Sequence, residues 1–382
     1  MNHQKSWIRS KLIEIYERII PQGKFLKDKI YLNGEDNLYP NTIKNLINQS
    51  PTAKRCSSLF FKYIIGDGVV NNIDINSRIT LNDIAFAMAR EVASVYEFYV
   101  WVGYGIDANG NFYKNNFKII SADKVRKQID DDEGNNGKLI VTDWNAKTQL
   151  WGDRKNKKEK WFYPFNDNQN VVRSQILNDS GSNEITAESL SKYRGQLYHC
   201  NLTSEYQYGL PPWDSVFNDM TSEANIGIYT ANEVKNGFLG KTIVATSGLS
   251  AEAEESVAKD LKGLLGSENS ANFWHVSLEA GEKIEDNLKF IQLKPQYDDK
   301  LFQLTENRLR KNILGAFSIP EDLVYSNGGL FGNSTDKYNE LKKFYWEQLN
   351  YERKFISDRL FELGFQNVEF IKTYTDAVPV LN

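Results

Sequence analysis

The chain has 382 residues, 41% of them hydrophobic and 25% charged, which is typical of a globular protein and excludes a largely disordered one. A formal net charge of −4 argues against a basic nucleic-acid-binding protein. No run of 18 apolar residues exists, so the sequence predicts neither a transmembrane helix nor a membrane partner. Two cysteines cannot form a disulfide framework and the polar N-terminus does not resemble a signal peptide, so we expect a protein made in a reducing cytoplasm.

The first 95 residues are predicted to be mainly helical. Apolar residues recur at helical spacing over residues 4 to 19, and a short helix runs to about Asn48. The pair Ser50-Pro51 then supplies an N-cap and a first helical residue, and Gly66 ends that helix. A further helix gives way near Val95 to a strand.

The middle of the chain is predicted to be rich in strands. Glu97 is the only charge in "VYEFYVWVGY", so we expect both faces of this first strand to be covered. From residue 110 to 205, short apolar runs such as "FKII" and "QLYHC" alternate with turns rich in Asp, Asn and Gly. This alternation favours β structure over the whole stretch.

Beyond residue 210 the pattern becomes mostly helical. Two prolines open a helix over residues 211 to 236, and the strands "FLGKTIVATSG" and "NFWHVSL" bracket another helix. An amphipathic helix covers residues 296 to 317. A single long helix then covers residues 335 to 363, which is on the order of 40 Å at 1.5 Å per residue, and it stops at Gly364. Together these elements predict an α+β fold.

Three short motifs lack the partners that their chemistry needs. Gly240-Lys241-Thr242 ends like a phosphate-binding loop, but Lys235 stands where that loop requires glycine. The acidic run 130–133 lacks the remaining ligands of a calcium loop. The histidines are scattered, and the adjacent His199-Cys200 would point to opposite faces of a strand. We therefore expect no cofactor, no metal and no catalytic residues, and a protein that is not an enzyme.

A basic run in the middle of the chain has two interpretations. It contains Arg154, Lys155, Lys157, Lys158 and Lys160. It is either an exposed loop between strands or a contact surface for phosphates or for an acidic partner.

The segment from residue 326 to 333 joins two predicted helices through glycines. Gly328, Gly329 and Gly332 flank the bulky pair Leu330-Phe331. Because glycine leaves the backbone conformationally free, we expect a flexible hinge that carries two large apolar side chains.

Several segments, taken in chain order, resemble the portal proteins of tailed bacteriophages, of the small portal type. One is "NLYPNTIKNLINQSP", followed by the turn from Ile65 to Gly68. The second is the segment from Tyr208 to Pro212, "YGLPP", which opens a helix ending in Asn-Gly. The third runs from Asp298 to Leu323 and precedes the glycine loop and the last long helix. The order agrees over roughly residues 35 to 365.

This resemblance implies a portal-type fold with little or no crown. A wing of helices and strands would comprise residues 1–144 and 238–325, a β-rich clip residues 145–205, and a stem helix residues 206–237. Residues 334–382 would form the long C-terminal helix and a short tail. The basic run would be a partner contact of the clip. The tunnel loop that lines the channel would comprise Ser326, Asn327, Gly328, Gly329, Leu330, Phe331, Gly332 and Asn333. The alternative for this loop is a linker between helices that has no contact with DNA.

The resemblance also implies a structural function. The chain would form a homo-oligomeric ring, with twelve subunits as the usual number, at one capsid vertex of a virion assembled in the host cytoplasm. Phage DNA would pass through the ring during packaging and ejection. Its protein partners would be the large terminase, the head–tail adaptor and the major capsid or scaffold proteins. An aromatic content of 13% suits extensive lateral interfaces.

Two other classes of function compete with this one. The first is another virion or scaffold protein of similar α+β design. The second is a nucleic-acid-processing enzyme, which would need a carboxylate cluster or a complete phosphate-binding loop.

Overall fold

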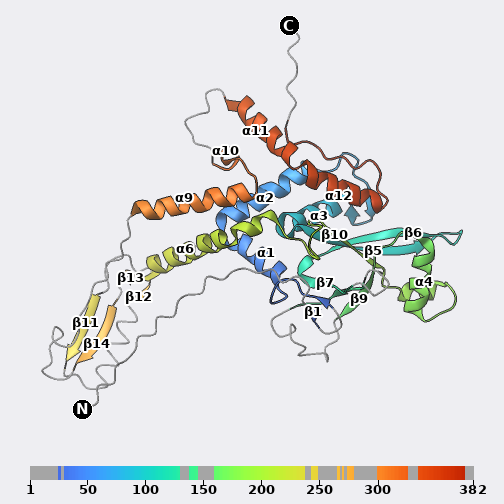
Figure 1. The fold of residues 1–382 in the computed structure, drawn as a ribbon, viewed down its shortest axis with the longest axis horizontal. Coiled ribbons are helices and arrows are strands. Elements are labelled where there is room, and N and C mark those ends of the chain that lie inside the picture. The colour runs from blue at the N-terminus through green and yellow to red at the C-terminus, as the bar shows by residue number, and fades with distance from the viewer. Residues whose placement is uncertain are drawn as a thin grey trace, which may run out of the picture. The chain divides into compact units, whose positions relative to one another are not determined.

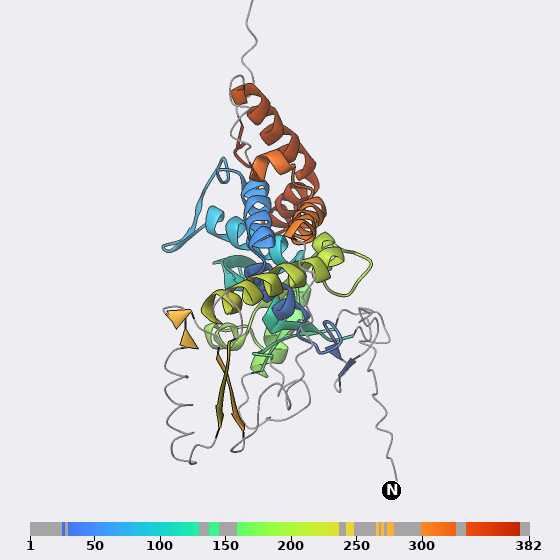
Figure 2. The ribbon, with the colours of Figure 1, turned by 90° about the vertical axis from the view of Figure 1, so that its left-hand side faces the viewer.

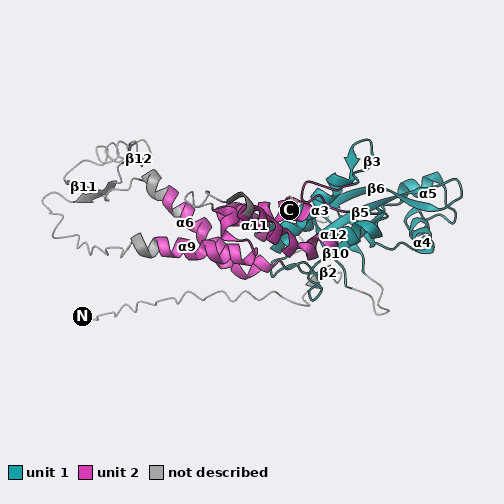
Figure 3. Cartoon of the chain, turned by 90° about the horizontal axis from the view of Figure 1, so that it is seen from above, with its two compact units in different colours: residues 1–42, 71–210, 356–368 teal, residues 43–70, 211–355, 369–382 magenta. Residues whose placement is uncertain are grey.

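The computed structural model describes residues 25–26, 30–129, 137–144, 159–236, 242–247, 265–266, 269–270, 273–278, 299–325 and 334–374. The chain divides into two compact units, each assembled from segments far apart in the sequence (Figure 3). Unit 1 comprises residues 1–42, 71–210 and 356–368. Unit 2 comprises residues 43–70, 211–355 and 369–382.

Unit 1 is organised around a six-stranded sheet with the strand order β6-β5-β10-β9-β8-β7 (Figure 1). Neighbouring strands are antiparallel except β10 and β9, which are parallel. In that order the strands are β6 (Phe112–Ile120), β5 (Glu97–Ile106), β10 (Gln196–Asn201), β9 (Lys160–Pro164), β8 (Leu139–Val141) and β7 (Val125–Lys127).

The strand β5 is buried on both faces, as its sequence predicts. Eight of its ten residues are buried, and helix α3 (Leu81–Val95) packs against it and against β6. Thr80 and Asp83 form a reciprocal capping box at the start of α3. Tyr96 adopts a left-handed conformation, with φ at 63°, and ends the helix immediately before β5. The predicted change from helix to strand near Val95 is therefore confirmed.

The prediction that residues 110 to 205 are rich in strands is wrong for one stretch. Two helices, α4 (Gln169–Ser180) and α5 (Ala187–Lys192), lie between β9 and β10 in the sequence. Only three residues of α4 are buried and many of the others are polar, so the helical period is weak in its sequence. Gly181 is the left-handed C-cap of α4, with φ at 64°, although a glycine in this part of the sequence is equally typical of a turn between strands.

Short elements complete unit 1. The strand β1 (Phe25–Leu26) pairs with β2 (Ile30–Tyr31), and β3 (Asp74–Asn76) pairs with β4 (Ile79–Thr80). One turn of 3₁₀-helix, η2 (Ala122–Lys124), precedes β7. The helix predicted over residues 4 to 19 lies outside the described residues.

Unit 2 is built mainly from helices. The helix α2 begins and ends as predicted, because the Ser50 side chain accepts a hydrogen bond from the Ala53 backbone N–H and Gly66 forms the C-cap. In unit 2 the helices α2, α6 and α9 pack against one another (Figures 1 and 2). The helices of this region before the glycine loop are α1 (Tyr39–Gln49), α2 (Pro51–Ile65), α6 (Phe217–Asn236), α9 (Asp299–Ala316) and α10 (Glu321–Val324). A 3₁₀ turn, η3 (Pro212–Val216), precedes α6.

Aromatic side chains fill the space where these helices meet. Trp213 stacks on Phe317 with ring centroids 4.4 Å apart, and Phe60 meets Trp213 edge-on at 5.3 Å. All three residues are buried. Each such pair contributes about 0.5–1.5 kcal/mol beyond its buried area, so this cluster is a main source of stability in unit 2.

Two strand pairs also belong to unit 2. The strands β11 (Thr242–Ser247) and β14 (Phe273–Leu278) are parallel, and β12 (Leu265–Gly266) is antiparallel to β13 (Asn269–Ser270). The two strands predicted within residues 238–248 and 272–278 are thus present as β11 and β14. The combination of helices with separate sheets is the α+β fold that the sequence predicts.

The prediction of one continuous helix over residues 335 to 363 is wrong at one point. The structure has two helices, α11 (Ser334–Gln348) and α12 (Asn350–Glu362), separated by Leu349. Arg353 donates hydrogen bonds to the backbone carbonyls of Trp346 and, at 2.9 Å, of Tyr63. The backbone bonds around Leu349 are long: the Leu349 N–H lies 3.3 Å from the Tyr345 carbonyl and the Arg353 N–H lies 3.2 Å from the Leu349 carbonyl, so the helical ladder is weakened here but continues.

The last described residues of unit 2 return to the end of α2. Val69 and Phe370 form a β-bridge, and the Ile371 backbone N–H donates to the Gly68 carbonyl at 2.8 Å. Gly66 has φ at 59°, and a Cβ atom there would lie 1.9 Å from the Ile371 carbonyl oxygen. Only glycine therefore fits at this turn.

Candidate functional site

Most residues singled out in the sequence lie outside the described residues. This holds for the whole glycine loop, 326–333, and for Arg154, Lys155, Lys157 and Lys158. Lys160 is described, and it is exposed as the first residue of β9. The structure thus neither brings the five basic residues together nor separates them.

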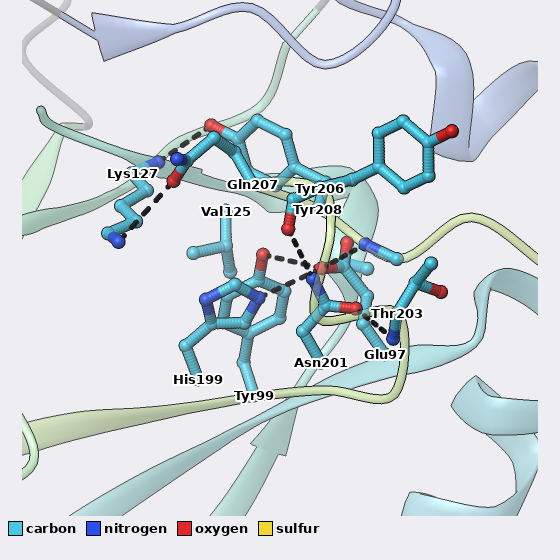
Figure 4. Close-up of polar contacts among 12 residues, drawn as sticks. Glu97, Tyr99, Val125, Lys127, His199, Asn201, Thr203, Tyr206, Gln207 and Tyr208 are labelled. Carbon is cyan, nitrogen blue, oxygen red and sulfur yellow. Dashed lines mark hydrogen bonds and ion pairs between the residues drawn. The ribbon is translucent and has the colours of Figure 1, made fainter. Parts of the chain in front are cut away.

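A buried polar cluster in unit 1 surrounds Glu97, which is 1% exposed (Figure 4). Its Oε2 atom lies 3.1 Å from the Tyr99 hydroxyl, 3.0 Å from His199 Nε2 and 2.9 Å from the Gly209 backbone nitrogen. The rings of Tyr99 and His199 stack with centroids 4.5 Å apart. Burying a carboxylate is costly unless it is hydrogen-bonded, so these three partners stabilise Glu97 in the sheet.

The segment that Glu97 binds is Tyr208-Gly209. The Tyr208 hydroxyl donates to the Tyr31 carbonyl and accepts from the Lys127 N–H, both at 2.8 Å (Figure 4 shows the second bond). A Cβ atom on Gly209 would lie 2.5 Å from the Val95 carbonyl oxygen, so no larger residue fits. Tyr208 and Gly209 therefore fix the backbone immediately before the prolines that open η3.

A buried arginine lies close to this cluster. Arg126, on β7, donates to Asn37 Oδ1 and to the Val125 carbonyl, each at 2.6 Å. Burial lowers the pKa of the Arg126 guanidinium, and the neighbouring Tyr208, Tyr99 and Glu97 act in the opposite direction. Burial, followed by the charge of Glu97, raises the pKa of the Tyr99 hydroxyl well above its usual value. Glu97, His199 and Arg126 come from β5, β10 and β7, so the buried polar residues of this region lie on three strands.

A second carboxylate, Glu223 on α6, gathers donors in unit 2. It accepts hydrogen bonds from the Ser50 hydroxyl, from the Thr52 hydroxyl at 2.5 Å and from the Thr52 backbone N–H at 3.2 Å. Ser50 and Thr52 lie at the N-terminus of α2, where the helix dipole favours a negative charge. Glu223 therefore ties α6 to the start of α2.

An open groove of about 970 Å³ lies beside Glu223. Its walls come from α2, α6 and α9 and from Tyr325, which follows α10. Ile226 and Ala231 contribute apolar surface, Arg55 and Arg310 contribute two guanidinium groups, and Glu223 and Glu306 contribute two carboxylates. The Arg55 guanidinium lies 5.7 Å from the centroid of the Tyr325 ring. The groove therefore combines apolar surface with cations on two different helices.

The side chains of Glu97, Arg126 and Glu223 bind backbone groups and side chains of neighbouring elements. Among the described residues, no group of three or more His, Cys, Asp or Glu side chains is placed to hold a metal ion. Both cysteines are buried, and burial raises the pKa of the Cys56 thiol to about 12. At neutral pH such a thiol carries almost no reactive thiolate.

None of the helices in the described part of the chain combines the length and the hydrophobicity that crossing a bilayer requires.

Sequence reasoning missed both carboxylate clusters because their members are far apart in the chain. Glu97 and Gly209 are separated by 112 residues, and Ser50 and Glu223 by 173. One signal was present: a single glutamate in an otherwise apolar strand must find hydrogen-bond partners if it is buried. The sequence did not show which residues those partners are.

Comparison with known proteins does not assign this chain to a family. No protein-family model matches the sequence, and no curated protein matches it. Among solved structures, a chain in the neck of the native gene transfer agent (GTA) particle has a TM-score of 0.41 at 13% identity, over 84% of this chain and 77% of that chain. A chain in the virion of the native GTA particle has a TM-score of 0.45 at 12% identity, over 89% and 84%. A chain in the neck of the empty GTA particle has a TM-score of 0.46 at 11% identity, over 87% and 84%. With TM-scores below 0.5, these likenesses carry no argument about what this chain does.

Proposed function

We propose that this chain is a portal-type subunit of a tailed-phage or phage-like particle. Copies of it close a ring, with twelve as the expected number, at one vertex of the capsid. The ring is a conduit for genome packaging and ejection and a docking site for the terminase and the head–tail connector. The observation that carries the proposal is the chain order of three portal-like segments, each of which coincides with structural elements.

The coincidence is specific in each case. The first segment covers α1 and the Ser50 cap of α2. The second contains Gly209, which has no room for a side chain and whose N–H binds Glu97. The third, from Asp298 to Leu323, covers α9 and most of α10. These segments form helices, a helix cap and a closely packed turn, so their residues determine the course of the backbone. A resemblance at such positions supports the proposal more than a resemblance in surface loops would.

The division into wing, clip, stem and tunnel loop is part of the same proposal. The stem corresponds to η3 and α6, which occupy residues 212–236. The tunnel loop, 326–333, connects α10 to α11 and would line the channel with small and apolar side chains. A conduit must not grip DNA, and a strongly basic lumen would bind phosphates through counterion release. The net charge of −4 and a loop without charged residues are compatible with this role.

The test is to image the purified protein by electron microscopy and to measure its mass by light scattering. We expect rings with a central hole and a mass close to twelve times 43.9 kDa. A chain that stays monomeric at every concentration and does not associate with capsids would overturn the proposal.

A further inference from the structure

The two-stranded sheet of β11 and β14 in unit 2 is a candidate contact between copies of this chain. We propose that the open edge of β14 in one copy pairs with the open edge of β11 in the next copy, so that one parallel sheet continues from copy to copy. This inference rests on the proposed function, because a ring is the assembly in which such a contact repeats. It identifies the backbone segments that would meet.

The first observation is the small size of this sheet. β11 and β14 run parallel and pair from Thr242 with Phe273 to Ser247 with Leu278, and no other described strand joins them (Figure 1). Backbone N–H and C=O groups alternate in direction along a strand, so half of those on each strand point away from the other strand. A sheet of two strands is at best marginally stable by itself, and further strands stabilise it.

The second observation is that neither strand has the features that usually prevent an edge from pairing. The sequences TIVATS and FWHVSL contain no Lys, Arg, Asp, Glu or Pro, and the register between them shows no bulge. Natural sheets protect exposed edges with such residues, with bulges or with very short strands. Uncharged strands of this length, rich in β-branched and aromatic residues, favour pairing with another strand.

The other described sheets have the protection that β11 and β14 lack. At one edge of the six-stranded sheet, β6 carries Lys114 and Lys118, and its pairing with β5 is interrupted by a shift in register. At the other edge, β7 is only three residues long. The strands of the pairs β1-β2, β3-β4 and β12-β13 have two or three residues each. Long unprotected edges are therefore particular to β11 and β14 among the described strands.

A second copy is the proposed occupant because it pairs both edges through one kind of contact. A different protein on the edge of β14 would leave the edge of β11 exposed. When β14 of one copy meets β11 of the next, repetition of the contact around a ring leaves no edge unpaired. Neighbouring copies in a ring are related by a small rotation, so their strands keep nearly the same direction and the contact is parallel. A contact between two identical edges would instead close a dimer.

Cysteine cross-linking between copies tests this contact. Each of the six positions of β11 and each of the six positions of β14 is replaced by cysteine, one position per variant. Every β11 variant is co-expressed with every β14 variant on tags of different size, and the purified assemblies are oxidised. Because each chain carries a single new cysteine, a disulfide between the two variants joins two copies. Adjacent strands lie about 4.8 Å apart, which a disulfide can span.

The expected result is a pattern as well as a yield. We expect at least about a tenfold excess of cross-links over the controls for pairs at one constant offset between the strands, because both positions advance together in a parallel register. Electrophoresis without reductant gives the yield, and mass spectrometry of the linked peptides identifies the pairs. Pairs in which one position advances while the other recedes would show antiparallel strands and would overturn the inference.

Matched controls separate a specific contact from chance collisions. The wild-type chain has Cys56 and Cys200, which are both buried, and it should not cross-link. The variants Ser174→Cys on α4 and Ser191→Cys on α5 place cysteines at exposed positions of unit 1 and should cross-link no more than the wild-type chain. Circular dichroism and light scattering show which variants fold and assemble. Neighbouring positions at the same offset report on the contact where one variant fails to fold.

The outcomes distinguish the inference from the proposed function. If the wild-type chain forms rings but no combination of β11 and β14 variants cross-links above the controls, the inference is wrong and the proposed function stands. Cross-links found only between two copies of the same variant would indicate a dimeric contact and would also overturn the inference. If the expected pairs cross-link in assemblies that never close into a ring, the inference stands and the proposed function fails.

Discussion

Each unit contains a carboxylate that gathers hydrogen bonds from distant segments, but the two carboxylates lie at different depths. Glu97 is 1% exposed, whereas Glu223 is only partly buried and faces an open groove. Each accepts three hydrogen bonds. Water from the groove can replace the Glu223 carboxylate beside the buried Ser50 and Thr52, whereas the Glu97 carboxylate is enclosed in the sheet. Depth, more than the number of bonds, should therefore decide what each carboxylate contributes to stability.

The largest effect is expected for Glu97→Ala. The change leaves Tyr99, His199 and Gly209 without their acceptor inside the sheet, and we expect a loss of about 3–5 kcal/mol in the free energy of unfolding. Urea unfolding followed by tryptophan fluorescence measures it. The control is Glu188→Ala on α5, in the same unit, where an exposed ion pair with Lys192 should contribute nothing measurable. Equal stability of the two variants would refute the importance of depth.

A smaller effect is expected for Gly209→Ala, which keeps Glu97 but crowds the segment that Glu97 binds. A Cβ atom placed 2.5 Å from the Val95 carbonyl forces a backbone shift, and we expect a loss of about 1–3 kcal/mol. The matched control is Gly315→Ala in α9, where an added Cβ meets no atom within 4 Å. The control should gain about 0.4–1 kcal/mol. Thermal unfolding compares the two, and a gain at both positions would contradict the structure.

The smallest loss is expected for Glu223→Ala. Ser50 still caps α2 and the released hydroxyls can bind water in the groove, so we expect about 1–2 kcal/mol. Glu306→Ala, on the facing wall of the groove, is the control and should change stability less. The measurement is urea unfolding under the conditions used for Glu97→Ala. A loss as large as that of Glu97→Ala would show that the groove is not accessible to water.

Local signals were sufficient for much of the fold. The ends of α2 follow from Ser50, Pro51 and Gly66, each of which acts on backbone within one turn. The change from α3 to β5 follows from a change in the period of apolar residues. In these places the sequence pattern and the structure depend on the same few neighbouring residues.

Other features depend on partners that no local pattern contains. Beside the break at Leu349, Arg353 binds the carbonyl of Tyr63, 290 positions away in the chain, and this contact is set by tertiary packing. The helix α4 was missed because its buried face is too small to mark a period. Glu97 and Glu223 bind residues more than 100 positions away, so each cluster became visible only in the structure.

The β-bridge between Val69 and Phe370 has a consequence for the order in which the protein is made. A ribosome delivers the N-terminal part first, yet unit 2 needs residues 369–371 to close the turn after α2, and unit 1 includes residues 356–368. Neither unit can fold completely until the ribosome has synthesised these residues. At about 5–20 residues per second, the 300 residues between Val69 and Phe370 take roughly 15–60 seconds.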